Sequence, residues 1–460
     1  MNKILYLLLV LCVFSSCDQD FEEVFDKNPT ERKNEAKAEL TNVLANAEHG
    51  WKTILVVGDK VKAGDFFLFD FVPVEGQNNG EVTVANPFDS STSEFEIRSE
   101  NGTVLSFNSW NEVFYWLVTP NGWEPGGVGS DLEFVYVKEE NGKLFFRGKA
   151  KDIEMVLEPA TAEDWDTTAI QEQFANFRAR FNTNFTGIRL TKGMGATEET
   201  PFVSVFFDAF ISNSSLGFPE KKDFFYGIKY WTGEKRHETA EASFVFTKDG
   251  IVLANPLVIE GDTLSKLTYN ADLDTWEVAD EGLEGEVVSS DLPIHSHPNA
   301  TDYLFEVLKT TYNKSWYFSP WSDSWSGKFT EILGPIYDGP VVNYVQLGAE
   351  YTSPEGEVYG PGILLKGSVW GTSAYLPVEV IKNGESEFRL EWTGEIISDI
   401  EGVEDFINTD ANMKQILEML FNETGWSLAL DIFEYPDGSK IYDYEMYYMP
   451  DPSYRFYASF

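Results

Sequence analysis

Histidines are scarce in this chain, and two of the four lie almost side by side. His295 and His297 are separated by one residue, so a strand would place both imidazoles on one face as a pair of metal ligands. Pro293 and Pro298 flank the pair, and prolines at these positions favour a surface loop. We therefore favour a loop without metal and keep His295 and His297 as candidate metal ligands only.

A second set of possible metal ligands occupies residues 270–281. Asp272 and Asp274 offer hard carboxylate oxygens of the kind that calcium prefers. The segment lacks the central glycine and the terminal bidentate glutamate of an EF-hand loop, so a solvated β-turn is the favoured interpretation. We expect no cofactor, with calcium as the alternative.

Sequence motifs of common catalytic sites are absent. The chain contains no His-Glu-x-x-His zinc helix, no Gly-x-Ser-x-Gly elbow and no phosphate-binding P-loop. A pair of carboxylates can cleave glycosidic bonds, but with 76 acidic residues no pair stands out. We therefore favour a non-catalytic protein, with a carboxylate-dependent, glycosidase-like hydrolase as the alternative.

An unusual aromatic segment covers residues 315–327. Trp316, Trp321 and Trp325 lie there among serine, aspartate and proline residues. Exposed indoles on a loop can stack on the apolar faces of sugar rings, and this makes the three tryptophans candidate ligand contacts. The alternative, which we favour, is that they fold inward and fill the edge of a core. Trp110 and Trp116 lie in an apolar run and are expected to be buried in the core.

The first residues have the pattern of a bacterial lipoprotein signal. Lys3 is followed by an apolar run over residues 4–14, which is shorter than the roughly 20 residues that span a bilayer. Phe14-Ser15-Ser16-Cys17 then resembles a lipobox, in which small residues precede the cleavage site and the cysteine thiol receives the lipid. We predict a lipid anchor at Cys17. The acidic segment that follows suits either an export signal to the cell surface or a solvated linker.

Composition limits the class of partner. The net charge is −42, and such a surface repels nucleic acid and anionic lipid. A hydrophobic content of 43% with 15% aromatic residues is too high for a disordered chain. The abundance of aromatic residues, together with Asn-Gly and Asp-Gly pairs, predicts strands joined in hairpins.

Helical and strand patterns alternate along the chain. Asn28 as N-cap, Pro29 at the first helical position and Glu31 two residues later predict a helix that Gly50 closes. Further helices are predicted near 162–182, 301–312 and 410–421. Alternating strands fill the intervals, and Asn141-Gly142 is the strongest hairpin signal.

These patterns predict an α+β fold, mainly antiparallel β, in two or three β-rich modules that an amphipathic helix introduces. The expected divisions are a signal peptide at 1–16, an acidic tether at 17–28, and modules at 29–160, 161–300 and 301–460, the last with the fourth helix near 410–421.

The opening of the body resembles a known family. Residues 24–32 (Val-Phe-Asp-Lys-Asn-Pro-Thr-Glu-Arg) and 47–52 (Ala-Glu-His-Gly-Trp-Lys) are similar to the start of Bacteroidota lipoproteins catalogued as domain of unknown function 4302. The resemblance spans roughly residues 17–430 and is looser beyond residue 52. It implies a surface or periplasmic lipoprotein that is often encoded near polymer-uptake systems. It implies no known activity and no site residues.

From these observations we expect a lipoprotein at the outer membrane that faces the cell surface and is non-catalytic. Its expected partners are the membrane, through the lipid anchor, a glycan or peptide polymer, and proteins of an uptake complex. Nucleic acid is not an expected partner.

Overall fold

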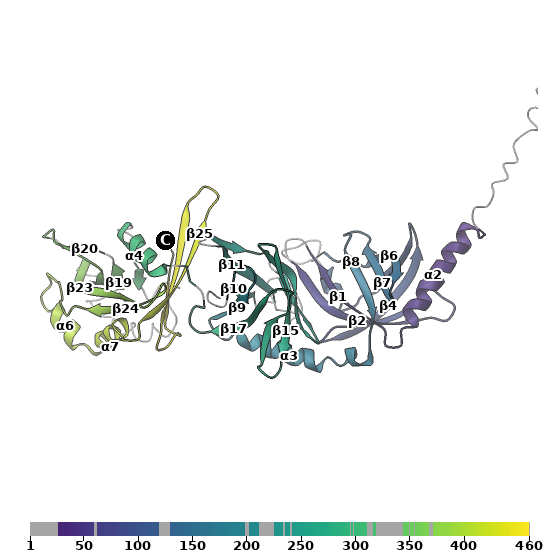
Figure 1. Ribbon diagram of the computed structural model, residues 1–460, viewed down its shortest axis with the longest axis horizontal. Helices are drawn as coiled ribbons and strands as arrows, with labels where there is room; N and C mark the ends of the chain where they lie inside the picture. Colours follow the sequence, from purple (N-terminus) through teal and green to yellow (C-terminus); the bar gives the residue numbers. More distant parts are fainter. Residues whose placement is uncertain are drawn as a thin grey trace, which may run out of the picture.

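The computed structural model describes residues 26–58, 62–118, 129–197, 202–210, 225–232, 235–239, 242–294, 296–297, 299–310, 316–318, 344–348, 350–353, 355–367 and 371–459. Three β-rich bodies follow one another along the long axis of the molecule (Figure 1). We call them the barrel, the middle sheet and the end sheet. Strand pairing is antiparallel in all three, and the predicted α+β, mainly antiparallel class is confirmed. The division into domains stays a prediction.

Helix α2 (Pro29–Ala45) begins as predicted. The Asn28 side chain accepts hydrogen bonds from the N–H groups of Thr30 and Glu31, and the Glu31 carboxylate accepts one from the Asn28 N–H, which completes a capping box. The predicted end at Gly50 is wrong, because the cap is Asn46. Gly50 instead lies directly before the first strand. A glycine is required there because a Cβ atom would lie 2.2 Å from the Phe69 carbonyl oxygen.

The barrel contains eight strands in sequence order and is closed between the first and the last. Its core combines aliphatic and aromatic side chains, and Phe67, Phe69, Phe95 and Phe134 are at most 1% exposed, so side chains fill the interior. Its strands are β1 (Trp51–Val57), β2 (Ala63–Pro73), β3 (Asn79–Ala85), β4 (Ser90–Ser99), β5 (Thr103–Phe107), β6 (Glu133–Glu140), β7 (Lys143–Gly148) and β8 (Glu154–Pro159).

One of the two tryptophans expected in this core is outside it. Trp116, in the short helix η1 (Tyr115–Leu117), is buried, but Trp110 is 61% exposed and the prediction for it is wrong. The reason is the neighbouring Asn111, whose buried side chain bonds the Ser91 carbonyl and the N–H groups of Val113 and Phe114. This fold of the loop directs Val113 and Phe114 inward and leaves the Trp110 indole at the surface.

The middle sheet follows a helical linker. The helix predicted near 162–182 is two elements, η2 (Ala162–Trp165) and α3 (Thr168–Arg180). Phe177 of α3 packs edge-on against Trp276 and Phe244 in the core. The strand order is β10-β9-β17-β16-β15-β14-β13-β11-β12, and β10 also pairs with β11. The strands are β9 (Phe185–Lys192), β10 (Phe202–Phe210), β11 (Phe225–Thr232), β12 (Lys235–Glu238), β13 (Ala242–Thr247), β14 (Gly250–Ile259), β15 (Asp262–Asn270), β16 (Thr275–Val278) and β17 (Glu284–Ser290).

The end sheet has eight strands in the order β18-β19-β22-β23-β24-β25-β26-β27, with the small pair β20–β21 beside it. Helix α4 (Ala300–Thr310) precedes it, and α6 (Val403–Thr409) and α7 (Ala411–Leu420) come before its last three strands. The strands are β18 (Trp316–Phe318), β19 (Tyr344–Gly348), β20 (Tyr351–Thr352), β21 (Val358–Tyr359), β22 (Gly362–Gly367), β23 (Gly371–Lys382), β24 (Glu387–Trp392), β25 (Trp426–Glu434), β26 (Lys440–Tyr448) and β27 (Arg455–Ser459). Within the described part of the chain, no helix has both the length and the apolar character needed to cross a membrane.

The barrel and the middle sheet are joined where β2 meets β13. The Ser243 N–H donates to the Lys62 carbonyl oxygen at 2.8 Å, and the Ser243 hydroxyl bonds both the N–H and the carbonyl of Gly64. Val245 packs so closely on Gly64 that a Cβ atom there would lie 2.9 Å from its Cγ2. These contacts bring the two bodies together along one side of the cleft described next.

Candidate functional site

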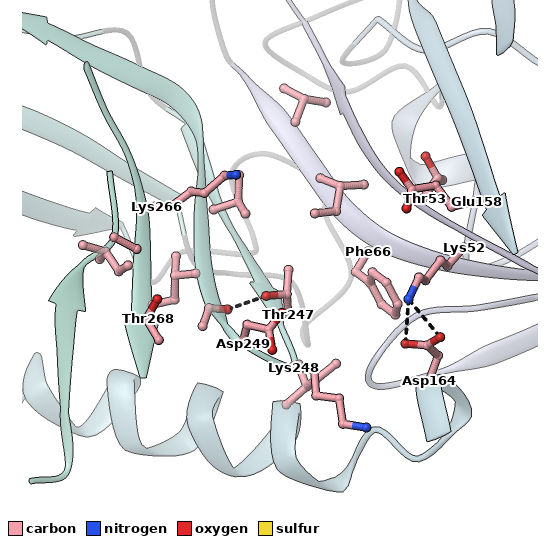
Figure 2. A pocket seen from close by; sticks show the side chains of 18 of the residues that line it. Lys52, Thr53, Phe66, Glu158, Asp164, Thr247, Lys248, Asp249, Lys266 and Thr268 are labelled. Atoms are coloured by element: carbon pink, nitrogen blue, oxygen red, sulfur yellow. Dashed lines mark hydrogen bonds and ion pairs between the residues drawn. The ribbon is translucent and has the colours of Figure 1, made fainter. Parts of the chain in front are cut away.

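A cleft of about 610 Å³ lies between the barrel and the middle sheet. Figure 2 shows its two walls, with β1 and β2 on one side, the strands around Thr247 and Lys266 on the other, and helical turns below. Its lining residues are Lys52, Thr53, Ile54, Val56, Phe66, Glu154, Val156, Glu158, Asp164, Asp166, Ile170, Thr247, Lys248, Asp249, Gly250, Ile251, Val252, Lys266, Leu267, Thr268 and Ala279.

The barrel wall of the cleft is the place where the barrel closes least tightly. Strand β1 pairs with β2 over seven residue pairs, from Trp51 to Val57. It pairs with β8 only through Trp51↔Pro159 and Lys52↔Glu158. Beyond Lys52 no further ladder pair joins the two strands, and this unpaired stretch, which we call the seam, includes the cleft residues Ile54, Val56, Glu154 and Val156.

The floor of the cleft holds an ion pair that ties the linker to the barrel. The Lys52 ammonium contacts both carboxylate oxygens of Asp164 at 3.0 Å (Figure 2). Burial opposes ionisation of Asp164, but hydrogen bonds from the Thr161 N–H, the Lys52 ammonium and the Thr161 hydroxyl outweigh it and lower the pKa of the carboxyl below its ordinary value. Nearby, the Trp165 indole N–H donates to the His49 carbonyl oxygen at 2.8 Å. These bonds hold the linker residues Asp164 and Trp165 against the barrel at the floor of the cleft.

The opposite wall is the β13–β14 hairpin with the adjoining β15. Lys248 reaches Glu163 at 3.4 Å, and the Lys248 carbonyl oxygen accepts a hydrogen bond from the Gln173 side chain of α3. The Lys266 side chain points from β15 into the gap (Figure 2). Asp249 lies at the hairpin turn and is exposed. This wall therefore presents charges of both signs to the cleft.

The cleft carboxyls with a shifted pKa do not suit general acid catalysis. Besides Asp164, Asp166 has a lowered pKa, because the hydroxyl and N–H of Thr168 donate hydrogen bonds to it. A general acid needs a raised pKa, as in glycoside hydrolysis. Asp164 is also occupied by Lys52 and Thr161. These two carboxyls are therefore poor candidates for a general acid.

Several residues singled out from the sequence, Cys17, His295, Trp321 and Trp325, are outside the described residues. Trp316 begins β18, whose backbone pairs with β19. His297, Asp272 and Asp274 are described and are not among the residues that line the cleft.

Asp272 and Asp274 lie in the turn between β15 and β16, as the β-turn interpretation predicted. Both are exposed, and Asp274 accepts a hydrogen bond from the Tyr269 hydroxyl at 2.8 Å and lies 3.5 Å from Arg180. Within the described ranges, no group of three or more histidine, cysteine or acidic side chains is placed to hold a metal ion.

For His297 the surface-loop prediction is wrong. The residue is 1% exposed, and its ring contacts Tyr303 of α4 edge-on. Its backbone N–H donates to the Leu430 carbonyl oxygen. No local pattern predicts this burial, because Tyr303 belongs to a helix that starts after the histidine and Leu430 is far along the chain. Lys52 and Asp164 were missed for the same reason, since their contact joins residues 112 positions apart.

Residues 21–271, more than half of the chain, match the family described as a domain of unknown function, DUF4302. The chain belongs to this family. The DUF4302 segment contains the barrel, the linker and the middle sheet up to β15, and therefore every lining residue of the cleft except Ala279. No curated protein matches the chain.

Proposed function

We propose that this DUF4302 protein is a non-catalytic lipoprotein of the Bacteroidota outer membrane that binds an extended polypeptide in the cleft, as an accessory to an uptake complex. Its lipid anchor is Cys17 and its body faces the cell surface. The observation that carries the proposal is the cleft itself, which combines exposed aliphatic side chains with charges of both signs. A peptide chain offers partners for both.

The lining favours a peptide over a glycan. Phe66 is the one aromatic residue among those that line the cleft, and it is 8% exposed, so no aromatic face is available there for a sugar ring. Ile54 is 43% exposed, and Val56 and Val156 beside it are half-buried. These aliphatic groups suit peptide side chains.

The charges favour a cationic peptide. Lys52 is paired with Asp164, and Lys248 with Glu163. Glu158 is paired with Lys143, which does not line the cleft. Glu154, Asp166 and Asp249 add three further carboxylates, whereas Lys266 adds one further cation. The whole chain carries a charge of −42, which steers a cationic ligand toward the protein over long range.

Charge reversal tests the binding proposal. Glu154→Lys combined with Asp249→Lys removes the negative charge at the cleft, and the affinity for a fluorescent lysine-rich peptide should fall about tenfold or more, since that factor needs only about 1.4 kcal/mol. The control is Glu404→Lys with Glu423→Lys, which changes the net charge equally at exposed sites on the end body. Equal losses in the two double variants would show that binding is nonspecific, and would contradict the proposed site.

The anchor has a separate test. Labelled palmitate should enter the wild-type protein in a bacterial host and be absent from Cys17→Ala, because the thiol is the acceptor of the lipid. Protease added to intact cells should then degrade the anchored body if it faces outward. Equal labelling of the two proteins would contradict the lipoprotein assignment.

A further inference from the structure

Trp110 is the one tryptophan among the large apolar residues found exposed in the described part of the chain, and it is 61% exposed. It belongs to the loop that leads from β5 to the short helix η1, which we call the Trp110 loop and define as residues 108–114. Val113 and Phe114 of this loop are buried in the barrel core. The loop therefore contributes two apolar side chains to the core and leaves the indole in water, so Trp110 does not serve to fill the barrel.

Hydrogen bonds to β4 hold the Trp110 loop on both sides of the exposed residue. Before it, the Ser109 hydroxyl accepts a hydrogen bond from the Glu94 N–H at 2.7 Å. After it, the Asn111 side chain donates to the Ser91 carbonyl oxygen at 3.0 Å. The backbone at Trp110 is thus fixed against a barrel strand, and a ligand that contacts the indole does not have to order the loop first.

A second ring supports the indole. The ring centroids of Trp110 and Tyr115 are 4.8 Å apart, with an angle of 46° between the ring planes. Tyr115 is half-buried and belongs to η1, which the buried Trp116 and Leu117 anchor in the barrel. The contact with Tyr115 holds the indole in one orientation while much of its surface stays in water. Rigid aromatic side chains of this kind supply contact area at a low cost in conformational entropy.

Polar side chains lie beside the two rings. Asn108 and Glu112 are exposed neighbours of Trp110 in the loop, and Thr92 and Glu94 are exposed on the adjoining strand β4. Their amide, hydroxyl and carboxylate groups both donate and accept hydrogen bonds. A sugar unit has an apolar C–H face and a rim of hydroxyl groups. An indole with polar groups beside it is complementary to both parts of such a unit.

Charge and surface composition narrow the class of ligand. The net charge of −42 repels polysaccharides that carry uronate, sulfate or phosphate groups. A protein partner would require a contiguous apolar surface, but the other large apolar residues found exposed in the described chain lie outside the Trp110 loop. A neutral polysaccharide needs neither charge attraction nor a wide apolar patch, and a ring contact with hydrogen bonds beside it is sufficient.

We propose that Trp110 and Tyr115 form a binding site for a neutral polysaccharide, in which the Trp110 indole stacks on the apolar face of one sugar unit. The Glu94 and Glu112 carboxylates accept hydrogen bonds from its hydroxyl groups. No residue of the Trp110 loop lines the cleft between the barrel and the middle sheet. Glycan binding here is therefore independent of peptide binding in the cleft.

Affinity electrophoresis tests the site with defined polymers. The gels contain soluble starch, barley β-glucan or galactomannan as neutral probes, and polygalacturonate as the acidic comparison. At least one neutral polymer should retard the wild type, and polygalacturonate should not. Trp110→Ala should weaken that retardation about three- to tenfold, because the stacking contact is lost, whereas Trp110→Phe should keep part of it. Lack of retardation by all three neutral polymers, or equal retardation of the wild type and Trp110→Ala, would overturn the proposal.

Tyr435→Ala is the matched control. Tyr435 is 43% exposed in the turn between β25 and β26, so this change also removes an exposed aromatic ring, but far from the barrel. The control should be retarded like the wild type. Its melting temperature and that of Trp110→Ala should be unchanged, because neither ring fills a core. Equal loss of retardation in Trp110→Ala and Tyr435→Ala would show nonspecific contact with exposed rings and would overturn the site.

Oxidation of the indole gives a readout in the wild type. N-bromosuccinimide should oxidise Trp110 in the free protein, as located by peptide mass spectrometry, and the polymer that retards the protein should protect it. Full oxidation of Trp110 at a saturating polymer concentration would overturn the proposal. Retardation should also persist at about 1 M salt, where charges are screened beyond about 3 Å, and its loss there would mean that charge and not stacking holds the polymer.

Two further measurements cover other occupants of the same ring. If Trp110→Ala weakens binding of a lysine-rich peptide and leaves binding of the neutral polymers unchanged, the ring belongs to a peptide site and the proposal is wrong. If sedimentation shows a dimer that Trp110→Ala dissociates, a second copy of this chain covers the indole. Monomeric protein with unchanged peptide affinity in Trp110→Ala is the result that we expect.

Discussion

Single residues fix the floor of the cleft, and Asp164 is the clearest case. Its side chain is 12% exposed, and the Lys52 partner is 30% exposed, so this ion pair is shielded from water more than those at the surface. The carboxylate also accepts hydrogen bonds from the N–H and hydroxyl of Thr161. One carboxyl thus connects the first barrel strand to the linker that leads into α3.

The lowered pKa of Asp164 leads to a prediction about stability. Asp164→Asn should lower the free energy of unfolding by about 1–3 kcal/mol, since hydrogen bonds to a charged group are lost. A carboxyl whose pKa is lower in the folded state stabilises fully above its unfolded pKa of about 4, and the contribution is lost as pH falls through the folded pKa. Urea unfolding should therefore show a difference between wild type and variant at pH 7 that shrinks below pH of about 4.

The control for this prediction is the adjacent residue. The Glu163 side chain is 85% exposed and reaches Lys248 at 3.4 Å, so Glu163→Gln should change stability by less than about 0.5 kcal/mol. A difference between Asp164→Asn and wild type that persists unchanged at low pH would show that the effect does not come from ionisation.

At the scale of elements, local signals in the sequence were sufficient for helices and hairpins. Asn28, Pro29 and Glu31 act within one turn, and the structure shows the capping box they predict. Asn141 and Gly142 both have positive φ angles, and they join β6 to β7 as the hairpin signal required. These features depend on residues close in the chain, so spacing alone reveals them.

Helix α2 gives the prediction at this scale. Leu40 is 2% exposed and packs in the barrel core cluster, so Leu40→Ala should cost about 2–5 kcal/mol. Asn28→Ala, at the exposed cap of the same helix, should cost about 1 kcal/mol. Urea unfolding measures both, and a Leu40→Ala variant as stable as Asn28→Ala would mean that the helix adds little to the core.

The candidate site lay beyond the reach of such signals. The cleft depends on β2 of the barrel meeting β13 of the middle sheet, where Ser243 bonds Gly64. No spacing in the sequence reports a contact between residues 179 positions apart. The exposed Trp110 was missed for a related reason, because an apolar neighbourhood in sequence does not show which side chains the Asn111 turn directs inward.

At the scale of the whole molecule, the cleft lies where two bodies meet. The barrel interior is a core of its own, and the core of the middle sheet extends onto Phe66 and Leu68 of β2 and Ala85 of β3. Helix α3 contacts both, since Gln171 donates to the Pro87 carbonyl oxygen beside β3 and Gln173 donates to the Lys248 carbonyl oxygen in the β13–β14 turn. Together with Lys52–Asp164 below, these contacts hold the walls at a fixed separation. A ligand that contacts both walls therefore requires the barrel and the middle sheet to stay joined.

Gly64 is the position where this joining can be tested. A Cβ atom there would lie 2.9 Å from Cγ2 of Val245 and 3.0 Å from Cγ2 of Val56, distances at which a neighbour must move. Gly64→Val should therefore force β13 away from β2 and cost about 1–3 kcal/mol, as overpacking of a tight contact does. The barrel interior is a core of its own, and Gly64 lies where the barrel meets the middle sheet. We therefore expect calorimetry to show the barrel and the middle sheet unfolding in two separated transitions, and lysine-rich peptide binding to weaken. Gly227→Val is the matched control, since Gly227 is also a strand glycine and has nothing within 4 Å of its Cβ position. If Gly64→Val unfolds with the same thermal profile as Gly227→Val and binds peptide equally well, the close contact at Gly64 is not what couples the two bodies. The coupling then comes from α3, the Lys52–Asp164 pair and the packing of Phe66 and Leu68 in the core of the middle sheet.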